Sequence, residues 1–218
     1  MALVSQWLFD LTSNDTTGSN TLTANGTPGY APGINSSGTF LNGSSNWYRT
    51  ASHTNLDFST GTNFSVMAWV KLASTGAAAF ITNYNDPTMT AGWQWYMLNA
   101  GLIGFFIAGG NRFVTLNSGI GTNIWYHLVF TVHRSNGVNC YRNGLYNGQN
   151  TGVSNAWSAS SGGGKLVVGC EYNPGARRFV SGIMDDVRVY NEELSAATIK
   201  SIYQSYHGVY GLAGGVTV

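Results

Sequence analysis

The sequence predicts an all-β protein, built as a two-sheet antiparallel sandwich with one short helix near the C-terminus. Short apolar and aromatic runs recur along the chain, as expected for strands that are half or fully buried. Between them stand Asn-Gly pairs, a strong hairpin signal because both residues tolerate a positive φ. These pairs occur at positions 25–26, 42–43, 136–137, 143–144 and 147–148. Charged residues make up 9% of the chain and aromatic residues 13%, which indicates a folded core under a neutral polar surface.

The expected strands follow one another along the chain. Residues 3–9 place Trp7 and Phe9 on one face, and residues 64–71 are apolar on both faces, which predicts a strand covered from both sides. Further strands are expected at residues 93–98, 104–108, 125–133, 138–142, 166–170 and 183–190. Within these strands we expect Trp7, Trp69 and Trp125 to be core residues and His127 to be a hydrogen-bonded core histidine.

One segment has helical periodicity. Ser195 can serve as the N-cap, and Ile199, Ile202, Tyr203 and Tyr206 form an apolar stripe at helical spacing. A short amphipathic helix is therefore expected over residues 195–206.

The overall charge excludes some classes of partner. A net charge of +1, without clustered Lys and Arg, argues against nucleic-acid binding. No apolar run approaches the length of a membrane span, and the first residues do not resemble a signal peptide. Cys140 and Cys170 belong to no CxxC motif and are expected to be buried and reduced, with a disulfide as the alternative.

An ordered set of segments resembles the laminin-G-like, or concanavalin A-like, jelly-roll family. The segments are W-x-F-D from Trp7, F-L-N-G from Phe40, F-S-V-M-A-W-V-K from Phe64, W-Y-H-L-V from Trp125, Y-R-N-G from Tyr141, L-V-V-G from Leu166 and G-I-M-D-D-V-R-V-Y-N from Gly182. The resemblance implies a lectin-like jelly-roll domain over residues 1–203. It leaves residues 204–218 as an apolar, Gly-rich tail.

Catalysis is not expected, although the wider family includes glycoside hydrolases. Those enzymes need two facing carboxylates. This chain has three glutamates, Glu171, Glu192 and Glu193, and lacks the E-x-D-x-x-E pattern of the glucanases. Asp185 and Asp186 are adjacent and should point to opposite faces of a strand.

The resemblance also implies a calcium site. Its ligands would be Asp10, at the end of the first strand, with Asp185 or Asp186 on the late strand. The alternative is that Asp185 or Asp186 pairs with Arg188 or accepts backbone N–H bonds.

Glycan binding is the second expected activity, because loop aromatics beside amides and carboxylates suit sugars. The candidate residues are Trp47, Tyr84, Asn85, Asp86, Trp93, Tyr172 and Asn173. Trp93 shares a strand face with Trp95, and core packing of both is the alternative. The pair Arg177-Arg178 could bind an acidic ligand or could be a solvated loop pair.

The last residues carry no charge. Val209, Leu212, Val216 and Val218 are apolar, which suggests a docking arm for a neighbouring subunit, capsid or tail protein by strand addition. The alternative is an edge strand on the domain's own sandwich.

Taken together, these features predict a non-catalytic, lectin-like protein at an extracellular or virion surface, with glycans or host polysaccharide as ligands. The first interpretation is a phage or virus surface component, such as a head-decoration or fibre protein. The alternative is a carbohydrate-binding module from a larger secreted enzyme or adhesin.

Overall fold

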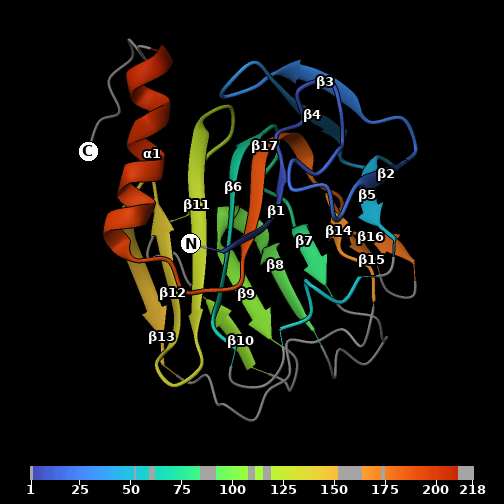
Figure 1. Ribbon diagram of the computed structural model, residues 1–218. Helices are drawn as coiled ribbons and strands as arrows, with labels where there is room; N and C mark the ends of the chain where they lie inside the picture. Colours follow the sequence, from blue (N-terminus) through green and yellow to red (C-terminus); the bar gives the residue numbers. More distant parts are fainter. Residues whose placement is uncertain are drawn as a thin grey trace.

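The computed structural model describes residues 2–51, 53–58, 62–83, 92–107, 111–114, 119–151, 164–172 and 175–210. Two antiparallel sheets lie face to face in these residues, and a helix lies against one side of the sandwich (Figure 1). This arrangement confirms the predicted all-β jelly-roll sandwich.

The larger sheet has eight strands. Its order is β13-β12-β11-β6-β17-β4-β3, and β1 also pairs with β17. The strands are β1 Leu3–Trp7, β3 Gly29–Pro32, β4 Ser37–Asn42, β6 Phe64–Leu72, β11 Trp125–His133, β12 Gly137–Arg142, β13 Leu145–Asn150 and β17 Ser181–Tyr190. The first and last strands of the domain therefore meet in the middle of this sheet, which ties the two ends of the sequence together.

The second sheet has seven strands in the order β10-β9-β8-β7-β14-β5-β2. The strands are β2 Leu22–Asn25, β5 Trp47–Thr50, β7 Ala78–Asn83, β8 Trp93–Met97, β9 Ile103–Ile107, β10 Asn111–Val114 and β14 Val167–Val168. A short 3-10 helix, η1 (Asn99–Gly101), connects β8 to β9. A separate two-stranded hairpin pairs β15 (Glu171–Tyr172) with β16 (Ala176–Arg177).

The main core fills the space between the two sheets. Alternation along β8 sends Trp93 and Trp95 into it, where Trp93 stacks on Phe105 with ring centroids 5.7 Å apart. Trp7 is fully buried there too, and its indole N–H donates to the Asn20 carbonyl at 2.8 Å. Cys140 and Cys170 are buried and not disulfide-bonded, as predicted.

The helix α1, Ala196–Tyr210, packs on the outer face of the eight-stranded sheet. Ser195 caps it as predicted, because its Oγ accepts the Thr198 N–H at 3.1 Å. The helix continues past residue 203, where the resemblance ends, and Tyr206 is buried against the sheet. Residues up to Tyr206 thus belong to the packed domain.

A second cluster of aromatic residues lies beneath α1 and contains Trp69 and Trp125, both of which were predicted to be core residues. Trp69 is buried, but under the helix rather than between the sheets, and its ring lies 5.6 Å from that of Tyr203. Trp125 is only partly buried in the same cluster. His127 is fully buried and contacts Trp69, but neither ring nitrogen has a hydrogen-bond partner among the described residues. The prediction of a hydrogen-bonded histidine is wrong: its partners are aromatic rings, and burial lowers its pKa to about 3.

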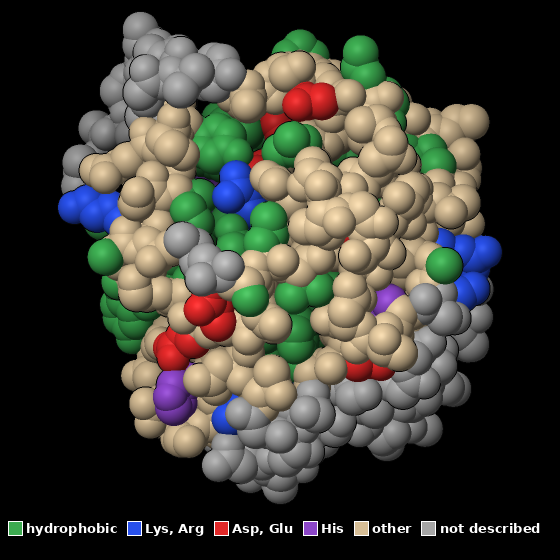
Figure 2. All heavy atoms as spheres, in the orientation of Figure 1, with side chains coloured by type: hydrophobic (Ala, Val, Ile, Leu, Met, Phe, Trp, Pro, Cys, Tyr) green, Lys and Arg blue, Asp and Glu red, His purple; other side chains and the backbone are tan. Residues whose placement is uncertain are grey.

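The surface is largely uncharged, as the composition predicts. Figure 2 shows one face of the molecule, on which acidic and basic side chains are scattered among polar uncharged groups and backbone. Within the described residues, no helix has the length and apolar character needed to cross a membrane.

Candidate functional site

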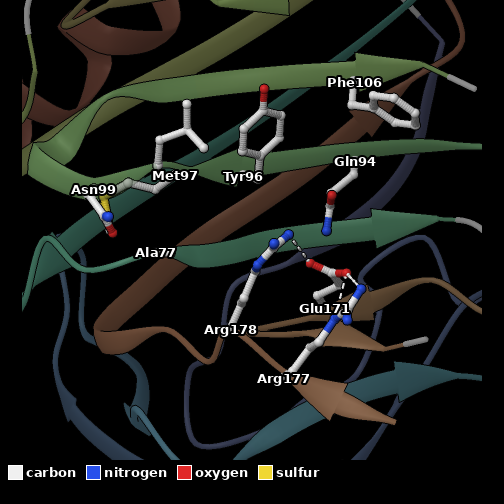
Figure 3. Close-up of a pocket in the computed structure, with 10 residues that line it drawn as sticks. Ala77, Gln94, Tyr96, Met97, Asn99, Phe106, Glu171, Arg177 and Arg178 are labelled. Carbon is white, nitrogen blue, oxygen red and sulfur yellow. Dashed lines mark hydrogen bonds and ion pairs between the residues drawn. The ribbon is translucent and has the colours of Figure 1, made fainter. Parts of the chain in front are cut away.

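A pocket of about 560 Å³ lies on the outer face of the seven-stranded sheet, away from the main core. Strands β7 to β9 form its floor, and the β15-β16 hairpin with the residue after it forms a wall (Figure 3). Its described lining residues are Ala77, Gln94, Tyr96, Met97, Leu98, Asn99, Phe106, Glu171, Arg177 and Arg178.

The floor follows from the alternation of β8. Because Trp93 and Trp95 face the core, Gln94 and Tyr96 face outward. Tyr96 packs with Phe106 of β9 and Ala79 of β7 in a small cluster separate from the main core. These side chains form an aromatic floor flanked by an amide, and only a small part of each is exposed: 7% of Tyr96, 5% of Phe106 and 2% of Gln94.

Close packing fixes the position of the Tyr96 ring. Gly104 of β9 lies beside it, and a Cβ added at Gly104 would come within 2.6 Å of the ring carbon that carries the hydroxyl. The ring therefore occupies space that only a residue without a side chain leaves open.

The wall of the pocket is an ion-pair cluster. The Glu171 carboxylate has no exposed surface and lies between two guanidinium groups (Figure 3). Arg177 donates to Oε1 from Nε at 2.8 Å and also from Nη2, and Arg178 donates to Oε2 from Nη1 at 2.7 Å. The arginine side chains are 54% and 52% exposed, so the buried carboxylate holds two cations that face solvent.

Hydrogen bonds connect this wall to the floor. The Ala79 N–H donates to the Arg178 carbonyl at 2.8 Å. Thr82 Oγ1 donates to the Cys170 carbonyl at 3.2 Å and accepts from Gln94 Nε2 at 3.3 Å. The amide and the ion-pair cluster are thus held in a fixed relation by backbone and side-chain contacts.

The two predicted glycan residues whose side chains the structure describes, Trp47 and Trp93, are not among the described lining residues of this pocket. Trp93 is fully buried in the core, so the interpretation of its ring as a sugar platform is wrong and the core alternative holds. Trp47 is buried with Val167, Cys170, Ala176 and Phe179, beneath the segment that carries the hairpin. Its ring face contacts the Arg49 guanidinium at 5.8 Å.

Other candidates cannot be placed at the pocket. Tyr84, Asn85, Asp86 and Asn173 lie outside the described residues. The Tyr172 backbone belongs to β15, but its side chain is not described. The tail candidates divide similarly: Val209 falls in the last turn of α1, and Leu212, Val216 and Val218 lie outside the described residues.

Sequence reasoning did not identify the floor and wall of the pocket as a site. The signal for Gln94 and Tyr96 was available, because core tryptophans on one face of β8 leave these residues on the other. Glu171, by contrast, gave no local signal, since its role depends on a hairpin that returns two arginines to it. For those arginines the structure replaces the interpretation of a solvated loop pair with an organised ion-pair cluster.

The two adjacent aspartates lie at a β-bulge. Pairing between β17 and β6 shifts register between Asp185 and Arg188, and Asp186 has a φ of 43°. Asp185 accepts backbone N–H bonds from Ile34 at 2.8 Å and from Asp186 at 2.6 Å. Burial raises the Asp185 pKa to about 7, whereas the N–H donors oppose that shift.

Asp186 is occupied differently. It pairs with Arg188, whose Nη2 lies 2.8 Å from Oδ2, and it accepts from Gln6 Nε2 at 2.7 Å and from the Tyr206 hydroxyl. Asp10 accepts the Ser37 N–H at 3.0 Å. The alternative given by the sequence therefore holds for both residues. Asp185 accepts backbone N–H bonds, and Asp186 pairs with Arg188.

In the structure, protein donors contact the carboxylates proposed for calcium. Calcium takes six to eight oxygen ligands. In the part of the chain that the structure describes, no three His, Cys, Asp or Glu side chains come together in a way that could hold a metal. The oxygens of Asp185 and Asp186 are instead used by internal donors.

A family model for the concanavalin A-like lectin/glucanases superfamily matches residues 42–200. The chain belongs to this superfamily. No curated protein is similar enough in sequence to count as a relative of this superfamily member.

Solved structures share the fold. Domain 4 of an extracellular arabinanase from Geobacillus stearothermophilus, in complex with arabinotriose, has a TM-score of 0.72 and 22% identity, over 93% of this chain and 98% of that domain. The binding domain of Paraclostridial Mosquitocidal Protein 1 has a TM-score of 0.74 and 15% identity, over 94% of this chain and 52% of that one. A third structure is of botulinum neurotoxin type C, a toxin whose cell entry depends on interaction with two ganglioside molecules. It has a TM-score of 0.72 and 13% identity, over 94% of this chain and 51% of that one.

These identities show the fold alone, and this superfamily member spans about half of the toxin chains. The chemistry of its pocket is nevertheless well defined. An aromatic floor can pack against the C–H face of a sugar ring, while amide and guanidinium groups can bind hydroxyl or carboxylate oxygens.

Proposed function

We propose that this domain binds glycans without cleaving them, at the pocket between strands β7 to β9 and the β15-β16 hairpin. The proposal rests on one observation: a single pocket is lined by the aromatic residues Tyr96 and Phe106, by the Gln94 amide, and by the ion-pair cluster of Glu171 with its two arginines. A sugar ring needs an apolar surface for its C–H groups and directional partners for its hydroxyl groups, and this pocket offers both.

The described lining residues support binding rather than catalysis. Glycoside hydrolysis uses two carboxyl groups about 5–9 Å apart. Glu171 is the carboxylate among the described lining residues, and both its oxygens accept from arginines. A carboxylate held in this way is poorly placed to serve as a general acid or a nucleophile.

One structural neighbour favours a place in a larger secreted protein. It is a domain of an extracellular arabinanase, in complex with arabinotriose, and it is covered almost entirely by this chain. The interpretation as a virion-surface component, with capsid or tail partners, gains no support from the structural neighbours. A hydrolase in the same reading frame would favour the carbohydrate-binding module, whereas capsid and tail genes beside it would favour the virion component.

A binding panel tests the function. The wild-type protein is titrated with neutral and acidic oligosaccharides in a calorimeter, alongside Tyr96→Ala and Tyr146→Ala. Tyr146 is an exposed tyrosine on β13 of the other sheet and is the control for a change far from the pocket, and thermal melting of both variants checks that the buried Tyr96 can be truncated without unfolding the domain. We expect Tyr96→Ala to abolish binding, Tyr146→Ala to retain it, and no ligand to be cleaved. Equal binding by both variants would place the site elsewhere, and release of new reducing ends would contradict the non-catalytic role.

A further inference from the structure

The pocket collects charge in a protein that has little of it. The chain carries ten Lys and Arg and nine Asp and Glu in 218 residues. Three of these charges, Glu171, Arg177 and Arg178, lie together on one wall of the pocket. Two cations and one anion leave a net charge of +1 on the described lining residues.

Glu171 positions the arginines and does not face a ligand. Its side chain is completely buried, and its two oxygens accept hydrogen bonds from different arginines. A buried carboxylate requires such partners, because leaving water without them is costly. Both guanidinium groups are consequently anchored on the side that faces Glu171.

Arg178 is held by its backbone as well. Its φ of 50° lies in the left-handed region, which a residue with a long side chain seldom adopts. The Ala79 N–H, which donates to the Arg178 carbonyl, keeps this conformation against the edge of β7. The Arg178 backbone is therefore held in place by strand β7, while its side chain is held by Glu171.

We propose that the pocket selects glycans containing uronic acids, with Arg178 binding the sugar carboxylate. This inference rests on the proposed glycan-binding function. A guanidinium group has five N–H donors and no acceptor, and Arg178 uses Nη1 for Glu171. A planar carboxylate offers two oxygens that match the remaining fork of donors and neutralises the excess positive charge. Tyr96 and Phe106 lie in the floor, where the apolar face of the same sugar ring can pack.

The test compares two forms of one ligand. Trigalacturonate and its fully methyl-esterified form have the same sugar and linkage, but only the first carries charge. We expect the wild-type protein to bind the free acid about tenfold more tightly than the ester, as one charge-assisted contact would provide. Arg178→Gln should lose this preference and bind both forms alike, whereas Arg142→Gln, which removes an arginine from β12 in the other sheet, should keep it.

Each contrary result has a distinct meaning. Equal wild-type affinity for acid and ester overturns the uronate inference but leaves glycan binding intact, as does exclusive binding of neutral oligosaccharides through Tyr96. Equal binding of trigalacturonate and a sulfated oligosaccharide overturns carboxylate selection in favour of general charge attraction. If no neutral or acidic glycan binds, the proposed function itself fails. Should Arg178→Gln not fold, the acid-against-ester comparison on the wild-type protein still decides.

Discussion

Arg178 donates a hydrogen bond from Nη1 to Oε2 of Glu171 over 2.7 Å, although one side chain is half exposed and the other has no exposed surface. Arg177 holds the other carboxylate oxygen. Glu171 thus fixes two cations at the wall of the pocket, and the arrangement depends on its negative charge.

Replacing that charge tests its structural role. Glu171→Gln keeps the shape of the side chain but weakens the bonds to both arginines, so we expect a loss of about 1–3 kcal/mol in the free energy of unfolding. The half-exposed arginines can turn to water, which keeps the loss below that of a fully buried pair. Urea denaturation measures it. Glu193→Gln is the control, because Glu193 lies near the surface at 4.0 Å from His133. Equal stability of the two variants would contradict the role given to Glu171.

The floor of the pocket can be altered without removing any atom. Gly104→Ala should displace the Tyr96 ring, because the new Cβ would lie 2.6 Å from it. We expect glycan affinity to fall about tenfold while the protein stays folded, since the far end of the ring can move toward the pocket. Calorimetric titration and thermal melting measure the two effects. Gly121→Ala is the control, because the nearest atom to its Cβ would be at an ordinary 3.6 Å. Unchanged affinity in Gly104→Ala would show that the position of Tyr96 does not matter.

The docking of α1 depends on a buried hydroxyl. The Tyr206 hydroxyl donates to Asp186 and accepts from Arg188 Nη2 at 3.0 Å. Tyr206→Phe deletes this hydroxyl and leaves Asp186 and Arg188 each without one hydrogen bond. It should therefore lower the free energy of unfolding by about 1.5–3 kcal/mol. Tyr146→Phe, at an exposed position on β13, should change it little. If both variants denature at the same urea concentration as the wild type, α1 is not anchored through Tyr206.

His127 should make the protein sensitive to acid. Its pKa is about 3 in the folded protein, because burial disfavours the charged ring, against 6.5 for the free side chain. Between these values the unfolded chain binds a proton that the folded protein does not, so stability falls as the pH is lowered. From pH 7 to pH 5 this contributes a loss of about 2 kcal/mol.

His127→Phe should remove that part of the pH dependence, since a phenyl ring can occupy the site beside Trp69 and Tyr203 without titrating. Urea unfolding of both proteins at the two pH values isolates the contribution. Asp186 and Arg188, the nearest charges acting on His127, are present in both proteins and cancel in the comparison. Identical losses of stability in wild type and variant would mean that His127 titrates in the folded protein.

The sequence predicted the sandwich because strand alternation and Asn-Gly turns are local signals. The core positions of Trp7 and Trp93 follow from the same alternation. Trp69 was correctly predicted to be buried, but its covering element was not predicted. Periodicity indicates that a residue is buried and does not indicate whether a sheet or a helix covers it. The helix that covers Trp69 was recognised from Ser195 and its apolar stripe, yet only the fold shows which sheet it meets.

The site was less predictable because its parts come together only in three dimensions. Gln94 and Tyr96 lie more than seventy positions before the β15-β16 hairpin that faces them. The adjacent carboxylates Asp185 and Asp186 resembled a cation site, but a bulge directs them to separate internal donors. A bulge is set by pairing with neighbouring strands, and no residue type announces it.

The position of a bound sugar tests the central claim most directly. A crystal structure of the domain with the oligosaccharide that binds most tightly should show the sugar ring against Tyr96 and Phe106, with an oxygen of the ligand within hydrogen-bond distance of Arg178. A sugar bound at any other surface, with this pocket empty at saturating ligand, would contradict the account.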